Sequence, residues 1–172
     1  IPICLNSLAT WLIFTDGACE ENSLVGSSGG ALVAPNHRVV HHFGGDATKE
    51  VMSLLRETSQ HPIHELEMIP ILVSLRLWGH LMRGCQIVHY IDNESVRLAL
   101  LRGSGETAVA KQVASRIMEA ESFLKTKSWY ARVSSFSNLA DDPSRGNFDL
   151  LTKLGSIHQP IDWEDVRSSC SP

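Results

Sequence analysis

Residues 11–18 read WLIFTDGA, a run of aromatic, β-branched and apolar residues that stops at Asp16 and Gly17. This composition is typical of a buried strand that ends in a turn. Residues 85–91 read CQIVHYI, a second apolar run, and Asp92 follows it directly. The sequence therefore predicts two buried strands that each lead into an aspartate.

The segments around these two strands have the patterns of an α/β protein. Turn-forming residues bound further runs of strand composition, and apolar residues recur at helical spacing in three longer segments. We therefore expect an α/β fold in which helices flank a mixed five-stranded sheet of three antiparallel strands followed by parallel ones. The predicted strands are 11–18, 24–35, 38–45, 85–91 and 128–134, and the predicted helices are 63–80, 94–102 and 106–125.

The chain length of 172 residues suits one domain with a substantial core. We expect a lead-in at residues 1–10 and one domain at residues 11–155. Residues 156–172 are rich in serine, proline and acidic residues, which predicts a loosely held tail or linker. Residues 46–62 are polar and predict an irregular connection.

Composition narrows the class of protein. No apolar run approaches the roughly 20 residues that span a bilayer, and the first 14 residues lack the basic stretch of a signal peptide. The four cysteines have the spacing of neither a zinc motif nor a disulfide framework. We therefore expect an intracellular protein without membrane contact, in the cytoplasm, the nucleus or a viral or element particle. The net charge of −4 does not by itself favour nucleic acid as a partner, although basic residues gather in the second half of the chain.

Three acidic residues stand at the ends of predicted elements, and a fourth lies early in a predicted helix. Asp16 and Asp92 end strands, Glu67 lies early in a helix, and Asp141 lies in the turn NLADDPSRG. Each aspartate alone is more typical of a turn or a helix cap. Parallel neighbouring strands, however, would bring Asp16 and Asp92 to one edge of the sheet, and such close carboxylates need cations. Oxygen ligands without histidine or cysteine select Mg²⁺ or Mn²⁺, and a pair of such ions supports phosphoryl transfer.

In the segments FTDGA, LEMI, YIDN and NLADDPSRG the chain resembles the ribonuclease H domains of reverse transcriptases. The four segments occur in the order and approximate spacing of that family's acidic motifs, and NLADDPSRG is especially similar to hepadnaviral polymerases and some eukaryotic retrotransposons. The resemblance implies a ribonuclease H-like fold and a hydrolase, an endonuclease that cuts the RNA strand of RNA–DNA hybrids with two Mg²⁺ ions, or Mn²⁺ as a substitute. It also implies a covalently linked reverse transcriptase domain as a partner. The catalytic and metal-binding residues that it implies are Asp16, Glu67, Asp92 and Asp141.

Two of these assignments have a close alternative. Glu65 precedes Glu67 by two residues, about 200° around a helix, so only one of them can face the site. Asp142 is adjacent to Asp141. The family pattern favours Glu67 and Asp141. The sequence also departs from that pattern at Phe136, where many cellular members carry a histidine that is thought to help product release, and this departure makes slow turnover an expectation.

Six residues are candidates for contact with nucleic acid. The polar loop after residue 19 resembles the segment whose backbone touches the RNA strand in this family, since backbone and short polar groups can distinguish a 2′-hydroxyl; a flexible hairpin loop explains it equally well. An asparagine after a strand is commonly a helix cap, and a lone arginine is commonly a surface residue. The six candidates are Gly17, Asn22, Ser23, Asn93, Ser95 and Arg145.

Two other functions fit the same fold. One is a catalytically inactive scaffold domain of a polymerase, and the other is a nuclease or integrase that acts on DNA. The presence of all four acidic residues argues against a decayed domain, and the segment NLADDPSRG argues against an integrase.

Overall fold

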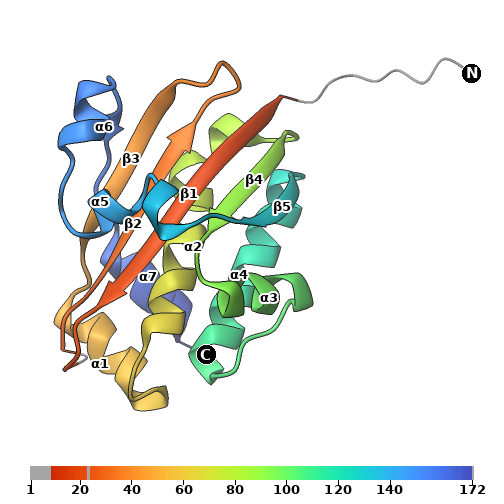
Figure 1. The fold of residues 1–172 in the computed structure, drawn as a ribbon. Coiled ribbons are helices and arrows are strands. Elements are labelled where there is room, and N and C mark those ends of the chain that lie inside the picture. The colour runs from red at the N-terminus through yellow and green to blue at the C-terminus, as the bar shows by residue number, and fades with distance from the viewer. Residues whose placement is uncertain (1–8, 23, 172) are drawn as a thin grey trace, which may run out of the picture.

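The structure, a computed structural model, describes residues 9–22 and 24–171 and has a mixed sheet of six strands at its centre (Figure 1). The strand order is β5-β4-β1-β2-β3-β6. β1, β2 and β3 form an antiparallel meander, and β4 and β5 run parallel to β1. The predicted fold class is confirmed, with one strand more than expected. The strands are β1 (Thr10–Cys19), β2 (Gly26–Val33), β3 (Val39–Asp46), β4 (Gln86–Ile91), β5 (Lys127–Arg132) and β6 (Ile157–His158).

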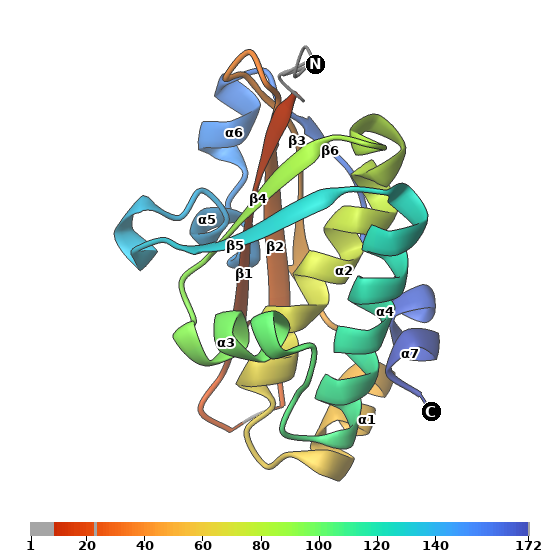
Figure 2. The same cartoon turned by 90° about the vertical axis from the view of Figure 1, so that its right-hand side faces the viewer.

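The long helices α2 (Ile63–Met82) and α4 (Ala108–Leu124) cover one face of the sheet, and the short helices α5 (Asp141–Ser144) and α6 (Asp149–Lys153) lie on the other face (Figure 2). The sheet-facing apolar side chains of α2 and α4 are buried in a single core that includes Trp78 and Phe43. No helix among the described residues is long and apolar enough to cross a membrane. The other helices are α1 (Lys49–Thr58), α3 (Glu94–Arg102), η1 (Ser135–Ser137) and α7 (Trp163–Cys170).

The C-terminal segment differs from the expectation of a loosely held tail or linker. Ile157 and His158 pair with β3, and α7 buries Val166 and Cys170 in the core. The apolar side chains of α7 stand four residues apart and so share one helix face. The prediction of a loose tail is therefore wrong for the described residues up to 171.

Two expectations near the N-terminal half also change. Residues 46–62 contain the regular helix α1, which buries Val51, Met52 and Leu55, so the prediction of an irregular connection is wrong there. Of the expected lead-in at residues 1–10, residues 1–8 lie outside the described residues, and Thr10 already belongs to β1.

Glycines in β2 and β3 let α5 lie directly on the sheet. Gly29 and Gly44 are paired across the two strands. A Cβ atom on Gly29 would lie 2.3 Å from the backbone nitrogen of Ser144, and one on Gly44 would lie 2.0 Å from the carbonyl oxygen of Pro143. Both glycines are therefore required by the close approach of another backbone, as glycines within strands often are.

We expect Gly44→Ala to lower the free energy of unfolding by about 1–3 kcal/mol, since the added methyl group forces α5 away from the sheet. Denaturant titration measures this change. Gly45→Ala is the matched control, because a Cβ atom there meets nothing within 4 Å, and we expect it to stay within about 0.5 kcal/mol of the parent. Equal losses in the two variants would contradict the close packing of α5.

Candidate metal centre

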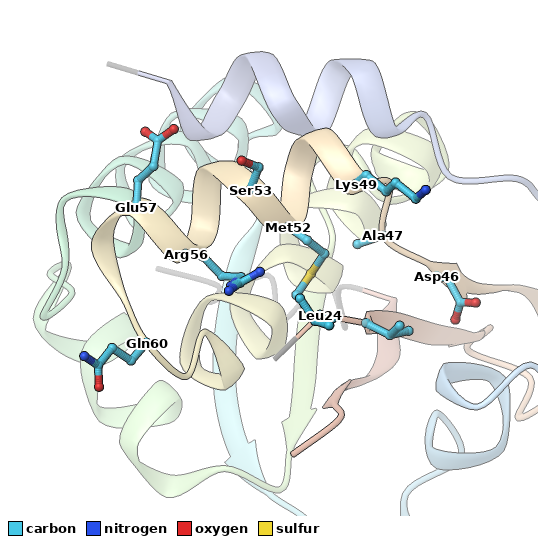
Figure 3. Close-up of a pocket in the computed structure, with 10 residues that line it drawn as sticks. Leu24, Asp46, Ala47, Lys49, Met52, Ser53, Arg56, Glu57 and Gln60 are labelled. Carbon is cyan, nitrogen blue, oxygen red and sulfur yellow. The ribbon is translucent and has the colours of Figure 1, made fainter. Parts of the chain in front are cut away.

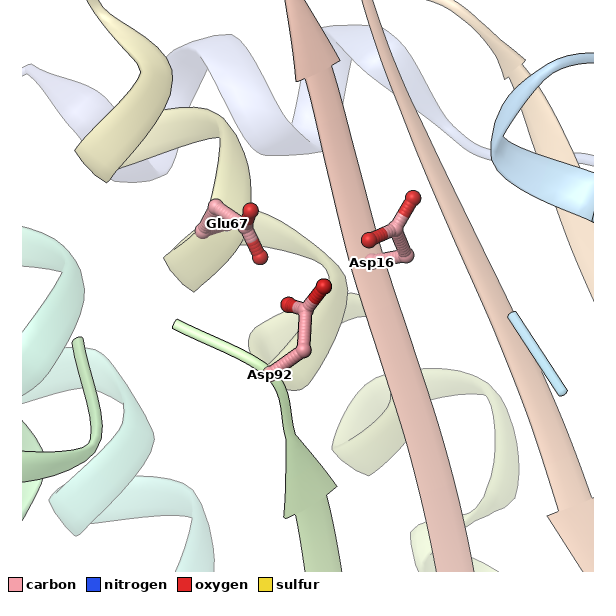
Figure 4. A group of neighbouring side chains, drawn as sticks. All are labelled: Asp16, Glu67 and Asp92. Atoms are coloured by element: carbon pink, nitrogen blue, oxygen red, sulfur yellow. The ribbon is translucent and has the colours of Figure 1, made fainter. Parts of the chain in front are cut away.

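Three carboxylates from distant parts of the chain meet beside β1 (Figure 4). Asp16 lies in β1, Asp92 directly follows β4, and Glu67 lies in the second turn of α2. One oxygen from each of the three lies within 4.8 Å of the other two. β1 and β4 are parallel neighbours, so the predicted meeting of Asp16 and Asp92 at one edge follows from the sheet topology.

A close approach of α2 to the sheet sets the position of Glu67. Pro70 lies inside α2 and has no N–H to donate to the carbonyl of Leu66, four residues earlier. Ser28 Oγ of β2 donates to that carbonyl instead, at 3.2 Å. Gly17 is paired with Ser28 in the sheet, and a Cβ atom on Gly17 would lie 2.4 Å from the Leu66 carbonyl oxygen. The helix therefore contacts bare backbone of β1 at the residue just before Glu67.

Glu65 points to a different part of the molecule. It is fully buried and accepts a hydrogen bond from Oγ1 of Thr107, the N-cap residue of α4. Since Glu65 and Glu67 are about 200° apart on the helix, only Glu67 contributes to the carboxylate cluster.

Burial and mutual repulsion raise the pKa values of two of these acids. Glu67 is 7% exposed, and burial, followed by the charges of Asp92 and Asp16, raises its pKa to about 9. The pKa of Asp16 rises to about 6, chiefly through burial, while a hydrogen bond from Ser144 opposes the rise. Oε2 of Glu67 and Oδ1 of Asp92 are buried and accept no hydrogen bond from the described residues.

This donor set fits divalent cations. Three carboxylates this close together cannot all ionise at low cost unless positive charge neutralises them. The two orphaned buried oxygens are free to bind an ion, and oxygen-only ligands suit hard cations such as Mg²⁺ and Mn²⁺.

The sequence matches no protein-family model, and no curated protein matches it. Solved structures do. RNase H1 from the halophilic archaeon Halobacterium salinarum NRC-1 is 17% identical, with a TM-score of 0.60 over 81% of this chain and 98% of that chain. The N-terminal RNase H domain of rv2228c from Mycobacterium tuberculosis is 16% identical, with a TM-score of 0.62 over 86% of this chain and 99% of that chain. LC11-RNase H1, solved in complex with an RNA/DNA hybrid, is 15% identical, with a TM-score of 0.58 over 83% of this chain and 99% of that chain.

The chain has the ribonuclease H fold. The antiparallel meander precedes the parallel strands, as the sequence predicts, and the carboxylate cluster is formed by residues of β1, of α2 and of the segment directly after β4.

Asp141 lies on α5, next to the three clustered acids but not among them. Its Oδ1 accepts a hydrogen bond from Nη2 of Arg145 at 3.0 Å, and its charge contributes to the raised pKa of Asp16. Asp142 uses its main-chain carbonyl to accept from the backbone of Arg145 and Asn147. The structure thus places Asp141 within electrostatic reach of Asp16 and gives the backbone of Asp142 a role in the turn.

Three candidate nucleic-acid contacts come from the region of the first turn. Gly17 is covered by α2, and its lack of a side chain allows that helix to lie against the backbone of β1. Oδ1 of Asn22 accepts a hydrogen bond from the backbone of Leu24 at 2.9 Å, as in a local turn. Ser23 lies outside the described residues. Contact of these residues with nucleic acid stays a prediction.

The other three candidates lie near the carboxylates. Asn93 caps α3, and its Oδ1 accepts from the backbone of Ser95 at 3.0 Å and of Val96 at 3.2 Å. The common cap interpretation is therefore realised. Ser95 is exposed, and Arg145 is a surface residue that pairs with Asp141. For these residues too, contact with nucleic acid stays a prediction.

Sequence reasoning missed two serines that hydrogen-bond to the clustered acids. Ser135 Oγ donates to Oδ2 of Asp92 at 3.0 Å, and Ser144 Oγ donates to Oδ2 of Asp16. Both belong to residues 133–145, which we call the crossing segment because it passes over β4 and β1 in Figure 1. The signal that could have found them is their place just before and inside NLADDPSRG.

A hollow of about 980 Å³ lies away from the carboxylates, between α1 and the β1–β2 connection (Figure 3). Its apolar floor includes Leu24 and Met52, while its charged residues are two cations and two anions whose charges cancel. None of the clustered acids lines it, so we do not connect it with the chemistry of the metal centre. The four charged residues are Asp46, Lys49, Arg56 and Glu57.

Proposed function

We propose that this chain is an endonuclease that hydrolyses the RNA strand of RNA–DNA hybrids by a two-metal-ion mechanism. The observation that carries the proposal is the carboxylate cluster of the buried Asp16 and Glu67 and the partly buried Asp92, with oxygens within 4.8 Å of one another, on a ribonuclease H fold. The solved complex of LC11-RNase H1 with an RNA/DNA hybrid supports the choice of substrate.

Four acidic residues of the chain would bind the ions. Asp16, Glu67 and Asp92 would bind divalent ions, and Asp141 would complete the ligand set from α5. Two bound Mg²⁺ or Mn²⁺ ions would activate the attacking water and stabilise the leaving oxygen. The carboxyl group of Glu67 holds a proton at neutral pH, because its pKa is about 9, and must release it to become a ligand.

The reaction that follows is hydrolysis of one phosphodiester bond. The water oxygen forms a bond to phosphorus, and the bond between phosphorus and the 3′-oxygen breaks. The products are a 5′-phosphate and a 3′-hydroxyl. Arg145 is exposed directly after the helix that begins at Asp141, and it would be available to a substrate phosphate once Asp141 binds an ion.

We also propose that the domain works within the reverse transcriptase of a retroelement or virus. The similarity of NLADDPSRG to segments of such polymerases supports this context. A net charge of −4 provides little electrostatic attraction for a polyanion. A covalently linked polymerase domain would therefore supply part of the affinity for the hybrid.

The test compares cleavage of an RNA–DNA hybrid, duplex DNA and duplex RNA by the parent chain with Mg²⁺ or Mn²⁺. We expect cleavage of the RNA strand of the hybrid alone, and none by Asp16→Asn, the control for a contaminating nuclease. Cleavage of duplex DNA would favour the DNA-acting nuclease instead. Absence of both cleavage and Mn²⁺ binding in calorimetry would favour an inactive scaffold domain.

Asp141→Asn is expected to lower the cleavage rate by on the order of 100-fold, at the upper end of losses seen for groups that support a metal site. The reason is that asparagine cannot supply the negative charge with which Asp141 would help to bind the divalent ions. Asp142→Asn is the matched control, since its main-chain hydrogen bonds survive the change, and we expect a rate close to the parent's. Initial rates at fixed Mg²⁺ measure both. A larger loss in Asp142→Asn than in Asp141→Asn would reverse the assignment.

A further inference from the structure

Ser144 links the two segments that carry Asp16 and Asp141. It is 1% exposed, and its hydroxyl donates to Oδ2 of Asp16, 128 residues earlier in the chain. The same oxygen lies 2.8 Å from the main-chain carbonyl oxygen of Asp141. One side chain thus contacts an acid of β1 and the backbone of the residue that would complete the ligand set.

The backbone around Ser144 has little room to move. Its amide donates to the carbonyl of Ala140 at 3.0 Å, and this amide lies where any Cβ atom on Gly29 would collide. Pro143 is in similar contact with Gly44. The sheet therefore fixes the height of α5 above β1, and with it the place of the Ser144 hydroxyl.

The hydrogen bond from Ser144 gives the two carboxylate oxygens of Asp16 different surroundings. Oδ2 accepts the hydrogen bond from the Ser144 hydroxyl. In Figure 4 one oxygen of Asp16 points toward Asp92 and Glu67, and the other points away. A carboxylate held through one oxygen presents the other in a fixed direction, as partners of metal ligands commonly ensure.

We propose that Ser144 is a positioning residue that fixes the carboxylate of Asp16 for metal binding and couples it to α5, the element of Asp141. The inference rests on the proposed function, because it assumes that Asp16 binds a metal ion. A purely local role is the alternative: serine hydroxyls often bond to a carbonyl one turn earlier in the same helix, as Ser144 could to Asp141.

Calorimetric Mn²⁺ binding to Ser144→Ala separates the two roles. Alanine is smaller than serine and fits the space, but it leaves Oδ2 of Asp16 without this donor. We expect the dissociation constant for Mn²⁺ to rise by about 10–100-fold, the range for lost partners of metal ligands. Ser144→Thr keeps the hydroxyl and is expected to restore most of the affinity. Thermal unfolding without metal confirms that each variant is folded.

Ser169→Ala is the matched control. Ser169 is also buried in a helix, bonds to the carbonyl of Asp165 at 2.8 Å and contacts Nη2 of Arg76 at 2.6 Å, far along the chain. We expect Mn²⁺ affinity equal to the parent's. Parental affinity in Ser144→Ala, or an equal loss in Ser169→Ala, would overturn the inference.

The outcomes for Ser144 and for the proposed function are distinguishable. If the parent chain binds Mn²⁺ but leaves the hybrid intact, the nuclease function is refuted. Weaker Mn²⁺ binding by Ser144→Ala would in that case still support the positioning role. A parent chain that cleaves the hybrid while Ser144→Ala binds Mn²⁺ normally would refute the positioning role alone. A parent chain that binds no Mn²⁺ would refute both.

Discussion

Glu67→Gln is expected to lower the rate of RNA-strand cleavage by more than the roughly 10–100-fold loss that follows removal of a supporting group around a metal. Glutamine keeps the shape of the side chain but cannot supply the negative charge that a divalent ion requires. The folded protein should tolerate the change, because the neutral amide resembles the protonated carboxyl group that a pKa of about 9 gives Glu67 at neutral pH. Initial rates on a labelled hybrid at fixed Mg²⁺ measure the loss.

Glu65→Gln is the matched control. Glu65 lies in the first turn of α2, two residues before Glu67, and is fully buried, but it bonds to Thr107 instead of facing the carboxylate cluster. Glutamine can still accept that hydrogen bond, so we expect a cleavage rate close to the parent's. Equal losses of rate in the two variants would mean that the loss of any buried carboxyl group on α2, and not the loss of metal binding by Glu67, explains the effect.

The sheet and the long helices could be predicted from the sequence because their patterns are local. The apolar runs locate β1 to β5 within two residues of the observed bounds, and helical spacing locates α2, α3 and α4 equally well. Pro70 is the exception within α2, since a proline normally interrupts a helix. The helix continues because Ser28, which lies in β2, donates a hydrogen bond to the carbonyl of Leu66, the group that Pro70 cannot bond. Sequence alone does not reveal that long-range contact.

The missed elements depend on tertiary packing more than on a strong local pattern. β6 has two residues and exists through its pairing with β3. α1 buries three apolar side chains, too few for a strong pattern, although the cap residue Thr48 and the acidic Glu50 after it are start signals that could have located the helix. α7 similarly begins at the cap residue Asp162.

The candidate site was predictable where topology decides it. Asp16 and Asp92 meet because β1 and β4 are parallel neighbours, a relation that the order of elements already implies. The choice of Glu67 over Glu65 follows from which face of α2 contacts β1, and that face depends on Gly17 and Ser28. The serines of the crossing segment could not be assigned to individual acids, because loop conformation determines which acid each one reaches.

The metal-free protein is expected to lose stability from Glu67 as the pH rises from about 5 to 9. The carboxyl group of Glu67 has a pKa of 4.5 in the unfolded chain and about 9 in the fold. The folded state therefore binds the proton more tightly, and the stability that this supplies is complete below pH 4.5 and lost as the pH approaches 9. Asp16, with a pKa raised from 3.8 to about 6, adds a loss of the same sign at lower pH.

Bound Mg²⁺ or Mn²⁺ should reverse this trend, because the ion replaces the proton on Glu67 and favours the ionised form. We expect the rise in melting temperature on adding Mn²⁺ to be larger at pH 8 than at pH 5. The contribution of Glu67 is measured as the difference in unfolding free energy between the parent and Glu67→Gln, in the presence of a chelator, from pH 5 to 9. This difference removes the contribution of groups whose stability effect has the opposite pH dependence. The buried His42 is one such group, because burial lowers its pKa. If that difference stays constant from pH 5 to 9, Glu67 does not titrate there, and the carboxylate cluster carries its charge without needing an ion to neutralise it.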